Sequence, residues 1–211
     1  AAAVSPSASE MDATCPSCGA GLETPLACGA CGVLMLTEDG ACPFALLGLE
    51  PGFPVDAKDL KTRLRRFTRL VHPDFFALEG EEALAKAERN NALLNEAFAV
   101  LSDETRRADQ LVARLGGPSE KDLGSMPQAF LMEVMEWNET LEEASPGSAE
   151  MLRLSSELTE HRDRISTEIA AALTPLPQPG AASLAGVRQS LNARRYVDRA
   201  LRRISASAGP A

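Results

Sequence analysis

The sequence predicts an all-α protein that carries a small cysteine-rich module near its N-terminus. Ala, Leu, Glu and Arg dominate the 211 residues and only 4% are aromatic, a composition that favours helix over sheet. Beyond about residue 43, apolar side chains recur at three- and four-residue spacing, and no segment there alternates like a strand. A hydrophobic fraction of 45% is enough to form a core, so a folded helical protein is expected.

Charge is distributed unevenly along the chain. The net charge is −9, which argues against nucleic acid as the main partner because phosphate binding needs a net basic surface. Residues 56–71 nevertheless hold six Lys or Arg and two Asp, whereas residues 120–168 hold twelve acidic and four basic side chains. A small basic face on an acidic protein indicates docking onto an acidic protein surface. No stretch approaches 18 uninterrupted apolar residues, so no membrane span is expected.

Changes in composition divide the chain into four parts. The opening residues are rich in Ala and Ser and lack the basic residues of a signal or transit peptide; a disordered tail is expected, with a trimmed precursor as the open alternative. The run Gly116-Gly117-Pro118 ends a helix and marks a boundary. The predicted parts are the tail at 1–12, a tetracysteine module at 13–36, a helical domain at 43–117 and a second helical domain at 125–206.

The cysteine spacing predicts a structural metal site. Cys15-x-x-Cys18 and Cys28-x-x-Cys31 are separated by nine residues, and two such knuckles can place four thiolates tetrahedrally about one Zn²⁺. With all four ligand positions filled by protein, the zinc would be structural rather than catalytic. Two disulfides would require an oxidising compartment, and a redox pair would normally sit in a βαβ setting that is lacking here. Cys42 is expected to be a spare thiol.

Residues 56–71 predict an amphipathic helix with a cationic side. The apolar stripe is Leu60, Leu64, Phe67 and Val71, and the opposite side carries Lys58, Lys61, Arg65 and Arg69. The helix should end at Val71, because Pro73 disfavours helical geometry at His72. Helical periodicity resumes near Glu81, so two antiparallel helices joined by a loop that begins His-Pro-Asp are expected, followed by a shorter helix at 105–115.

The His-Pro-Asp loop resembles the signature of a J-domain. It lies at the helix break, between a cationic helix and an amphipathic one, and the apolar segment Pro43–Leu49 precedes all three. This combination resembles the J-domain of DnaJ-type co-chaperones, a helical bundle built on a hairpin. The resemblance implies that the loop stimulates ATP hydrolysis by a DnaK-type chaperone. The chaperone-binding residues so implied are His72, Pro73, Asp74, Lys58, Lys61, Arg65, Arg66 and Arg69.

The chemistry of the loop fits docking better than catalysis. Proline fixes the backbone, so His72 and Asp74 lose little entropy on binding, and the Asp74 carboxylate can accept a charge-assisted hydrogen bond from a partner Arg. Nothing in the sequence marks a nucleophile or a substrate pocket. Spacing of i, i+2 across a proline is also not expected to bring His72 and Asp74 together as a dyad. We therefore assign no catalytic residue and expect a protein that is not an enzyme.

The resemblance extends beyond the J-domain to one family of co-chaperones. Three segments resemble HscB, the J-protein of iron–sulfur cluster biogenesis. They are Asn-Asn-Ala-Leu-Leu-Asn-Glu-Ala-Phe-Ala-Val-Leu from Asn90, Arg106-Arg107-Ala108, and Phe-Leu-Met-Glu-Val-Met-Glu from Phe130. The similarity covers roughly residues 44–201. Many J-domains have Lys after the Asp of the motif, whereas here the run is His-Pro-Asp-Phe-Phe. This run and the tetracysteine segment resemble eukaryotic-type members of the family. The family implies a C-terminal three-helix bundle that binds the scaffold IscU and hands it to the chaperone HscA or a mitochondrial equivalent.

The helix expected at 127–144 has an unusual outer side. Its core stripe is Phe130, Val134, Trp137, Leu141 and Ala144, and its opposite side carries Leu131, Met132, Met135, Glu136, Glu139 and Glu143. Apolar residues beside carboxylates indicate either an adaptable contact patch with an acidic rim or packing against another helix. The resemblance to HscB assigns all six, together with Tyr196, to scaffold binding. No function is assigned to His161.

The sequence therefore predicts an adaptor between a scaffold and a chaperone. The alternatives are a general J-protein that delivers another client, and a zinc-ribbon protein acting on nucleic acid, which the acidic composition disfavours. A bacterial cytoplasm is the expected location, with the mitochondrial matrix as the alternative.

Overall fold

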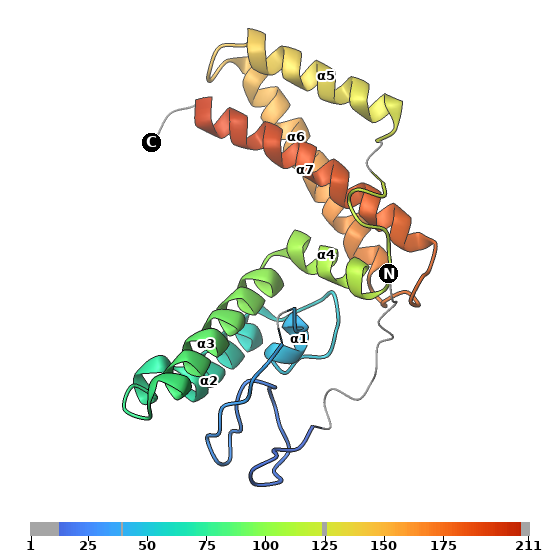
Figure 1. The fold of residues 1–211 in the computed structure, drawn as a ribbon. Coiled ribbons are helices and arrows are strands. Elements are labelled where there is room, and N and C mark those ends of the chain that lie inside the picture. Colours follow the sequence, from blue (N-terminus) through green and yellow to red (C-terminus); the bar gives the residue numbers. More distant parts are fainter. Residues whose placement is uncertain (1–12, 39, 124–125, 208–211) are drawn as a thin grey trace. The chain divides into compact units, whose positions relative to one another are not determined.

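The described part of the chain is helical. The computed structural model describes residues 13–38, 40–123 and 126–207; the predicted tail at 1–12 lies outside them. Figure 1 shows the order of the elements: α1 (Pro43–Leu46), α2 (Ala57–Val71), the 3-10 turn η1 (Pro73–Phe75), α3 (Glu81–Ser102), α4 (Glu104–Arg114), α5 (Gln128–Glu143), α6 (Ala149–Ala172) and α7 (Ser183–Ser207). β-Pairing in these residues is limited to two isolated bridges in the cysteine module. The predicted all-α class is confirmed.

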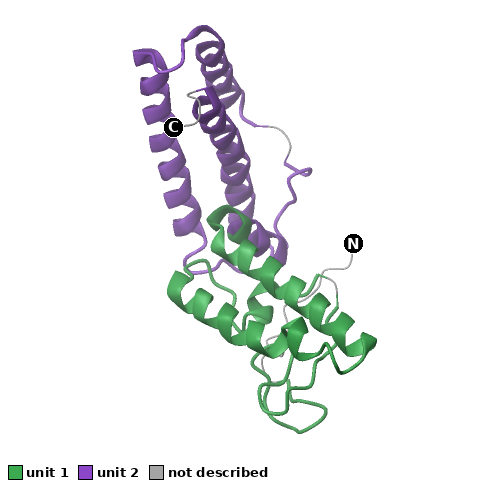
Figure 2. Ribbon diagram, turned by 90° about the vertical axis from the view of Figure 1, so that its left-hand side faces the viewer, with its two compact units in different colours: residues 1–107 green, residues 108–211 purple. Residues whose placement is uncertain are grey.

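The chain forms two compact units, coloured separately in Figure 2. Unit 1 comprises Ala1–Arg107 and unit 2 comprises Ala108–Ala211. The division falls inside α4, so the first turn of that helix belongs to unit 1 and the remainder to unit 2.

In unit 1, α2 begins and ends where its sequence dictates. The Asp56 side chain accepts hydrogen bonds from the backbone N–H groups of Lys58 (2.8 Å) and Asp59 (2.7 Å), an N-cap that satisfies two otherwise free donors. At the other end, His72 is extended (φ −68°, ψ 128°), and the helix stops at Val71. The predicted helix end is confirmed.

The core of unit 1 lies where α1 and α2 pack against α3. The largest fully buried side chains there are Phe44, Leu47, Phe67, Leu94 and Leu101. Leu64, expected in the apolar stripe of α2, is half-buried because it lies at the edge of that stripe. The His-Pro-Asp turn lies in the connection between α2 and α3, at the loop end of this hairpin.

In unit 2, α6 and α7 pack closely along their lengths, and α5 lies along this pair (Figure 1). Their core includes Leu154, Leu158, Ile165, Leu184, Leu191 and Val197. No side chain of α5, all of which the structure describes, is buried. The five residues predicted as its core stripe are only half-buried, because α5 contacts the pair along one side alone.

The segment before α5 is fastened to α7. Arg188 Nε donates to the Pro118 carbonyl (2.9 Å), and Asn192 Nδ2 donates to the Leu123 carbonyl (3.0 Å). Arg188, only 3% exposed, also pairs with Asp109 in α4. A Cβ on Gly117 would lie 2.6 Å from a methyl group of Val112, which explains the glycine at this crossing.

Candidate functional site

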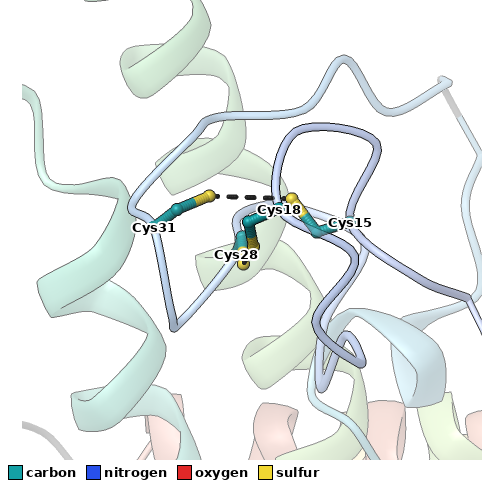
Figure 3. Close-up of side chains that lie close together, drawn as sticks. All are labelled: Cys15, Cys18, Cys28 and Cys31. Atoms are coloured by element: carbon teal, nitrogen blue, oxygen red, sulfur yellow. Dashed lines mark hydrogen bonds between the residues drawn. The ribbon is translucent and has the colours of Figure 1, made fainter.

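The four predicted metal ligands converge in unit 1. Figure 3 shows the side chains of Cys15, Cys18, Cys28 and Cys31 gathered around one point. Their sulfur atoms all lie within 4.8 Å of one another, with 3.6 Å from Cys15 to Cys31 and from Cys18 to Cys28. Thiolates bound tetrahedrally at about 2.3 Å from zinc would be about 3.8 Å apart. The four cysteines therefore have the geometry of a metal site.

Two similar turns build this cluster. Gly19 N donates to Cys15 O (2.8 Å) and Gly32 N donates to Cys28 O (2.9 Å), so each Cys-x-x-Cys pair is closed by the glycine that follows it. Both glycines have positive φ, 73° and 76°, which other residues rarely adopt. The turn that each knuckle requires therefore explains the glycine after its second cysteine.

The thiols of this cluster differ in acidity. Hydrogen bonds from the backbone of Cys31 and Ala30 lower the pKa of Cys28 to about 6, which favours the thiolate form that binds metal. A backbone hydrogen bond from Ala20 also acts to lower the pKa of Cys18, but hydrogen bonds with neighbouring thiols and burial outweigh it and raise that pKa to about 12. Without a cation, the cluster would not carry four negative charges.

The cysteine module, residues 13–36, is bonded to the helical hairpin. Asn90 of α3, 1% exposed, donates through Nδ2 to the carbonyls of Leu26 (2.8 Å) and Met35 (2.9 Å). Thr24 Oγ1 donates to the carbonyl of Leu46 at the end of α1 (2.9 Å). Leu26 and Met35 lie on either side of the second knuckle, so Asn90 holds both of its flanks.

Sequence reasoning used Asn90 only as part of a resemblance and missed this contact. A signal was present, because Asn90 lies three residues after Ala87 and four before Leu94, on the apolar face of its helix. A polar side chain at such a position must find hydrogen-bond partners when it is buried. The sequence could not name those partners, which lie more than fifty residues away.

The His-Pro-Asp turn is open to solvent. The side chains of His72 and Asp74 are 41% and 86% exposed. His72 Nδ1 accepts a hydrogen bond from the Asp74 backbone N–H (3.3 Å), and the same atom lies 3.6 Å from Asp74 Oδ2. The 3-10 turn η1 thus brings the two side chains near each other, but Nδ1 already accepts the backbone N–H and 3.6 Å is too long for a hydrogen bond to the carboxylate, so they do not form a hydrogen-bonded dyad.

The cationic face predicted on α2 divides into two groups. Lys58, Lys61, Arg65 and Arg69 are exposed on the helix surface. Arg66, also predicted to bind the chaperone, instead pairs with Glu23 of the cysteine module, and its guanidinium lies 4.8 Å from the Phe67 ring centroid. Arg66 is therefore engaged within the protein.

The predicted scaffold-binding residues of α5 face solvent. Leu131, Met132 and Met135 are 39%, 58% and 63% exposed, which is unusual for large apolar side chains. Glu136, Glu139 and Glu143 are also exposed. Tyr196 of α7 is half-buried, and its ring centroid lies 5.7 Å from that of Phe130, which places it beside α5. The alternative, that the three apolar residues pack against another helix, does not hold within the described residues.

An aromatic cluster joins the three helices of unit 2. The cluster consists of Phe130 and Trp137 of α5, His161 of α6 and Tyr196 of α7, and its ring contacts are edge-to-face. Nothing in the sequence connects His161 with these rings, because it lies among charged residues on α6. Only the packing of the helices brings it there.

Comparisons with known proteins agree with this geometry. A family model of the HSCB C-terminal oligomerisation domain matches residues 126–205. The co-chaperone protein HscB homolog of Shewanella baltica (strain OS195) is 30% identical over 135 residues, which are 62% of this chain and 78% of that protein. The chain belongs to the HscB family. The HscB homolog of Bordetella petrii is 33% identical over 131 residues, 62% of this chain and 77% of that protein.

Solved structures of HscB proteins share the fold. Human co-chaperone protein HscB superposes with a TM-score of 0.77 at 26% identity, covering 94% of this chain and all of that one. Chaperone HscB from Vibrio cholerae gives a TM-score of 0.65 at 22% identity over 78% of this chain and 95% of that one, a likeness of fold. Membership of this family makes the protein a J-domain co-chaperone and confirms the expectation that it is not an enzyme. Among the described helices, none is long and apolar enough to cross a membrane.

Proposed function

We propose that this protein binds an IscU-type iron–sulfur scaffold and stimulates the ATPase of a DnaK- or HscA-type chaperone, promoting cluster assembly and transfer. The observation that carries the proposal is the exposed turn at His72–Asp74, which follows the cationic face of α2 in a chain of the HscB family. Unit 1 would act on the chaperone and unit 2 on the scaffold.

The turn is suited to docking on the chaperone. Pro73 restricts its backbone, so little conformational entropy is lost on binding. The exposed Asp74 carboxylate is free to accept a charge-assisted hydrogen bond from an Arg of the partner. The exposed side chains of Lys58, Lys61 and Arg69 add long-range attraction toward an acidic surface, which salt weakens.

The outer side of α5 is suited to the scaffold. Its exposed methionines, Met132 and Met135, can adapt to a partner surface, and the glutamates beside them supply a charged rim. Desolvating these apolar side chains would supply affinity, whereas the acidic rim selects a partner with basic residues around an apolar centre.

The metal in the cysteine module would be zinc with a structural role. Cys15, Cys18, Cys28 and Cys31 would hold it, and four thiolate ligands leave no open position for a substrate. Zinc binding would fix the fold of the module. Through Asn90, that order would extend to α3.

The decisive experiment is chaperone stimulation by a His72→Gln variant. Single-turnover ATP hydrolysis by a DnaK- or HscA-type chaperone should lose at least about tenfold in stimulation, because the imidazole ring is lost and the Gln amide does not place its donor and acceptor where the ring nitrogens were. Binding of the scaffold, measured by calorimetry, should be unchanged, since α5 belongs to the other unit.

The chain offers a matched control for this test. It has only two histidines, and the second, His161, lies in unit 2. His161→Gln should leave chaperone stimulation in the absence of scaffold at the wild-type level. Equal stimulation by His72→Gln and wild type would contradict the proposal. Failure of the wild type to bind an IscU-type scaffold at micromolar concentration would instead favour a general J-protein with another client.

We also propose a bacterial cytoplasm as the site of action. The curated relatives that are 30% and 33% identical to this chain over 135 and 131 residues come from bacteria. The match to the human protein keeps the mitochondrial matrix as the alternative. Immunodetection in fractionated source cells would decide between them.

A further inference from the structure

The helix that carries the scaffold-binding residues is weakly supported by a core. None of the α5 side chains, all of them described, is buried. Beside its N-terminal half lies a hollow of about 440 Å³ lined by residues of α5, α6 and α7, among them Phe130, His161, Ile165 and Val187. Close packing of apolar side chains therefore does not by itself fix the rotation and position of this end of α5.

Aromatic contacts supply the missing support. The ring of Phe130 is 5.7 Å from Trp137, 5.7 Å from Tyr196 and 6.1 Å from His161, measured between centroids, and its interplanar angles are 81–90°. Trp137 lies 5.8 Å from His161 at 85°. Such edge-to-face pairs are the favoured arrangement of aromatic rings. His161 is the contribution of α6, and it touches both rings of α5.

We infer that His161 is a positioning residue for scaffold binding, holding α5 so that its exposed apolar residues and Tyr196 form one surface. Phe130 and Trp137 are seven residues apart on the inner side of α5, so fixing both rings fixes the rotation of the helix. Leu131 follows Phe130 directly on the outer side and moves with it. Tyr196 is set against the same ring from α7. This inference rests on the proposed function, because it assumes the scaffold as partner.

The test compares two substitutions of one residue. His161→Ala removes the ring and should weaken binding of an IscU-type scaffold about tenfold, the expected effect of losing two aromatic contacts. His161→Phe keeps a ring of similar shape and should restore affinity to near the wild-type value. Glu160→Ala, an exposed neighbour on the same helix, serves as the control and should bind like wild type. Wild-type affinity of His161→Ala, or equally weak binding by both variants of His161, would overturn the inference.

A second readout does not need the scaffold. Trp137 is the only tryptophan of the protein, so its fluorescence reports on the cluster alone. In the free full-length protein, His161→Ala should shift the emission to the red and increase quenching by acrylamide, while His161→Phe should not. If the wild type failed to bind the scaffold, the proposed function would fail, and unchanged fluorescence in His161→Ala would still refute the positioning role separately.

Two controls test whether a loss of scaffold binding merely reflects misfolding of the variant. His161→Ala should stimulate the chaperone ATPase like wild type when no scaffold is present, because His72 lies in unit 1. Should circular dichroism show that His161→Ala has lost helix, Phe130→Leu, which keeps an apolar side chain without a ring, provides the same test. Weakened scaffold binding by folded Phe130→Leu supports the inference, and wild-type affinity overturns it.

Discussion

Replacing Asn90 with Ala should destabilise unit 1 through the contact between the cysteine module and α3. The substitution removes the two hydrogen bonds from Nδ2 to the carbonyls of Leu26 and Met35. The site is almost completely buried, so water cannot readily replace the lost donors. Both flanks of the second cysteine pair would then lose their hydrogen bonds to Asn90.

The expected loss can be worked out from these two bonds. Each contributes about 1 kcal/mol net. The Leu26 carbonyl would keep its hydrogen bond from the backbone N–H of Met35 (3.0 Å), so the penalty for a buried carbonyl without a donor, about 1–3 kcal/mol, concerns the Met35 carbonyl alone. Two effects reduce the total. Ala is a better helix former than Asn by about 0.5 kcal/mol. In addition, Asn90 Oδ1 is buried without a hydrogen-bond partner among the described residues, so the substitution removes the cost of burying this oxygen. We expect a net loss of about 2 kcal/mol.

Urea unfolding of the metal-loaded protein measures this loss, with Asn95→Ala as the matched control. Asn95 is on the same helix, is exposed, and donates only to the Asn91 carbonyl within that helix (2.8 Å). Both substitutions change helix propensity equally, so their difference isolates the contact with the module. If the two variants differed by less than about 0.5 kcal/mol in free energy of unfolding, the assignment of Asn90 as the residue that holds the cysteine module to α3 would be refuted. In the wild type, metal removal by a chelator should also destabilise α3, and Asn90→Ala should reduce that linkage.

Two further predictions concern a close backbone approach and an ion pair. Gly48→Ala should destabilise unit 1 by more than about 2 kcal/mol in a thermal unfolding assay, because φ is +62° and the new Cβ would lie 2.5 Å from the Glu23 carbonyl oxygen. Gly147 has φ +76° and open space around it, so Gly147→Ala should cost clearly less in the same assay. Equal losses of stability in the two variants would contradict the predicted clash at Gly48. Arg195 holds the pKa of Glu120 below its usual value, so the pair stabilises the fold above that usual pKa and the effect is lost as pH falls through the folded-state pKa. The urea midpoint of Glu120→Gln should therefore be lower than that of wild type at pH 7, and the two midpoints should converge as pH falls below the folded-state pKa of Glu120. A difference that stays constant with pH would exclude this linkage.

The sequence by itself determined the features that depend on neighbouring residues. The end of α2 at Val71 follows from Pro73, and the turns of the cysteine pairs follow from the glycines after them. The set of residues that share the outer side of α5 followed from its helical period. In each case the determining interaction spans only a few residues, so the local pattern carried the whole cause.

Only the tertiary structure decided which distant groups meet. Asn90 reaches the cysteine module, Arg66 pairs with Glu23 instead of remaining free, and His161 enters an aromatic cluster built from three helices. The half-burial of the α5 stripe has the same origin, because an apolar face is buried only as far as its neighbours cover it. Periodicity names the side of a helix that is apolar. Periodicity does not predict which residue of another helix packs against that side, since this contact depends on how separate helices pack.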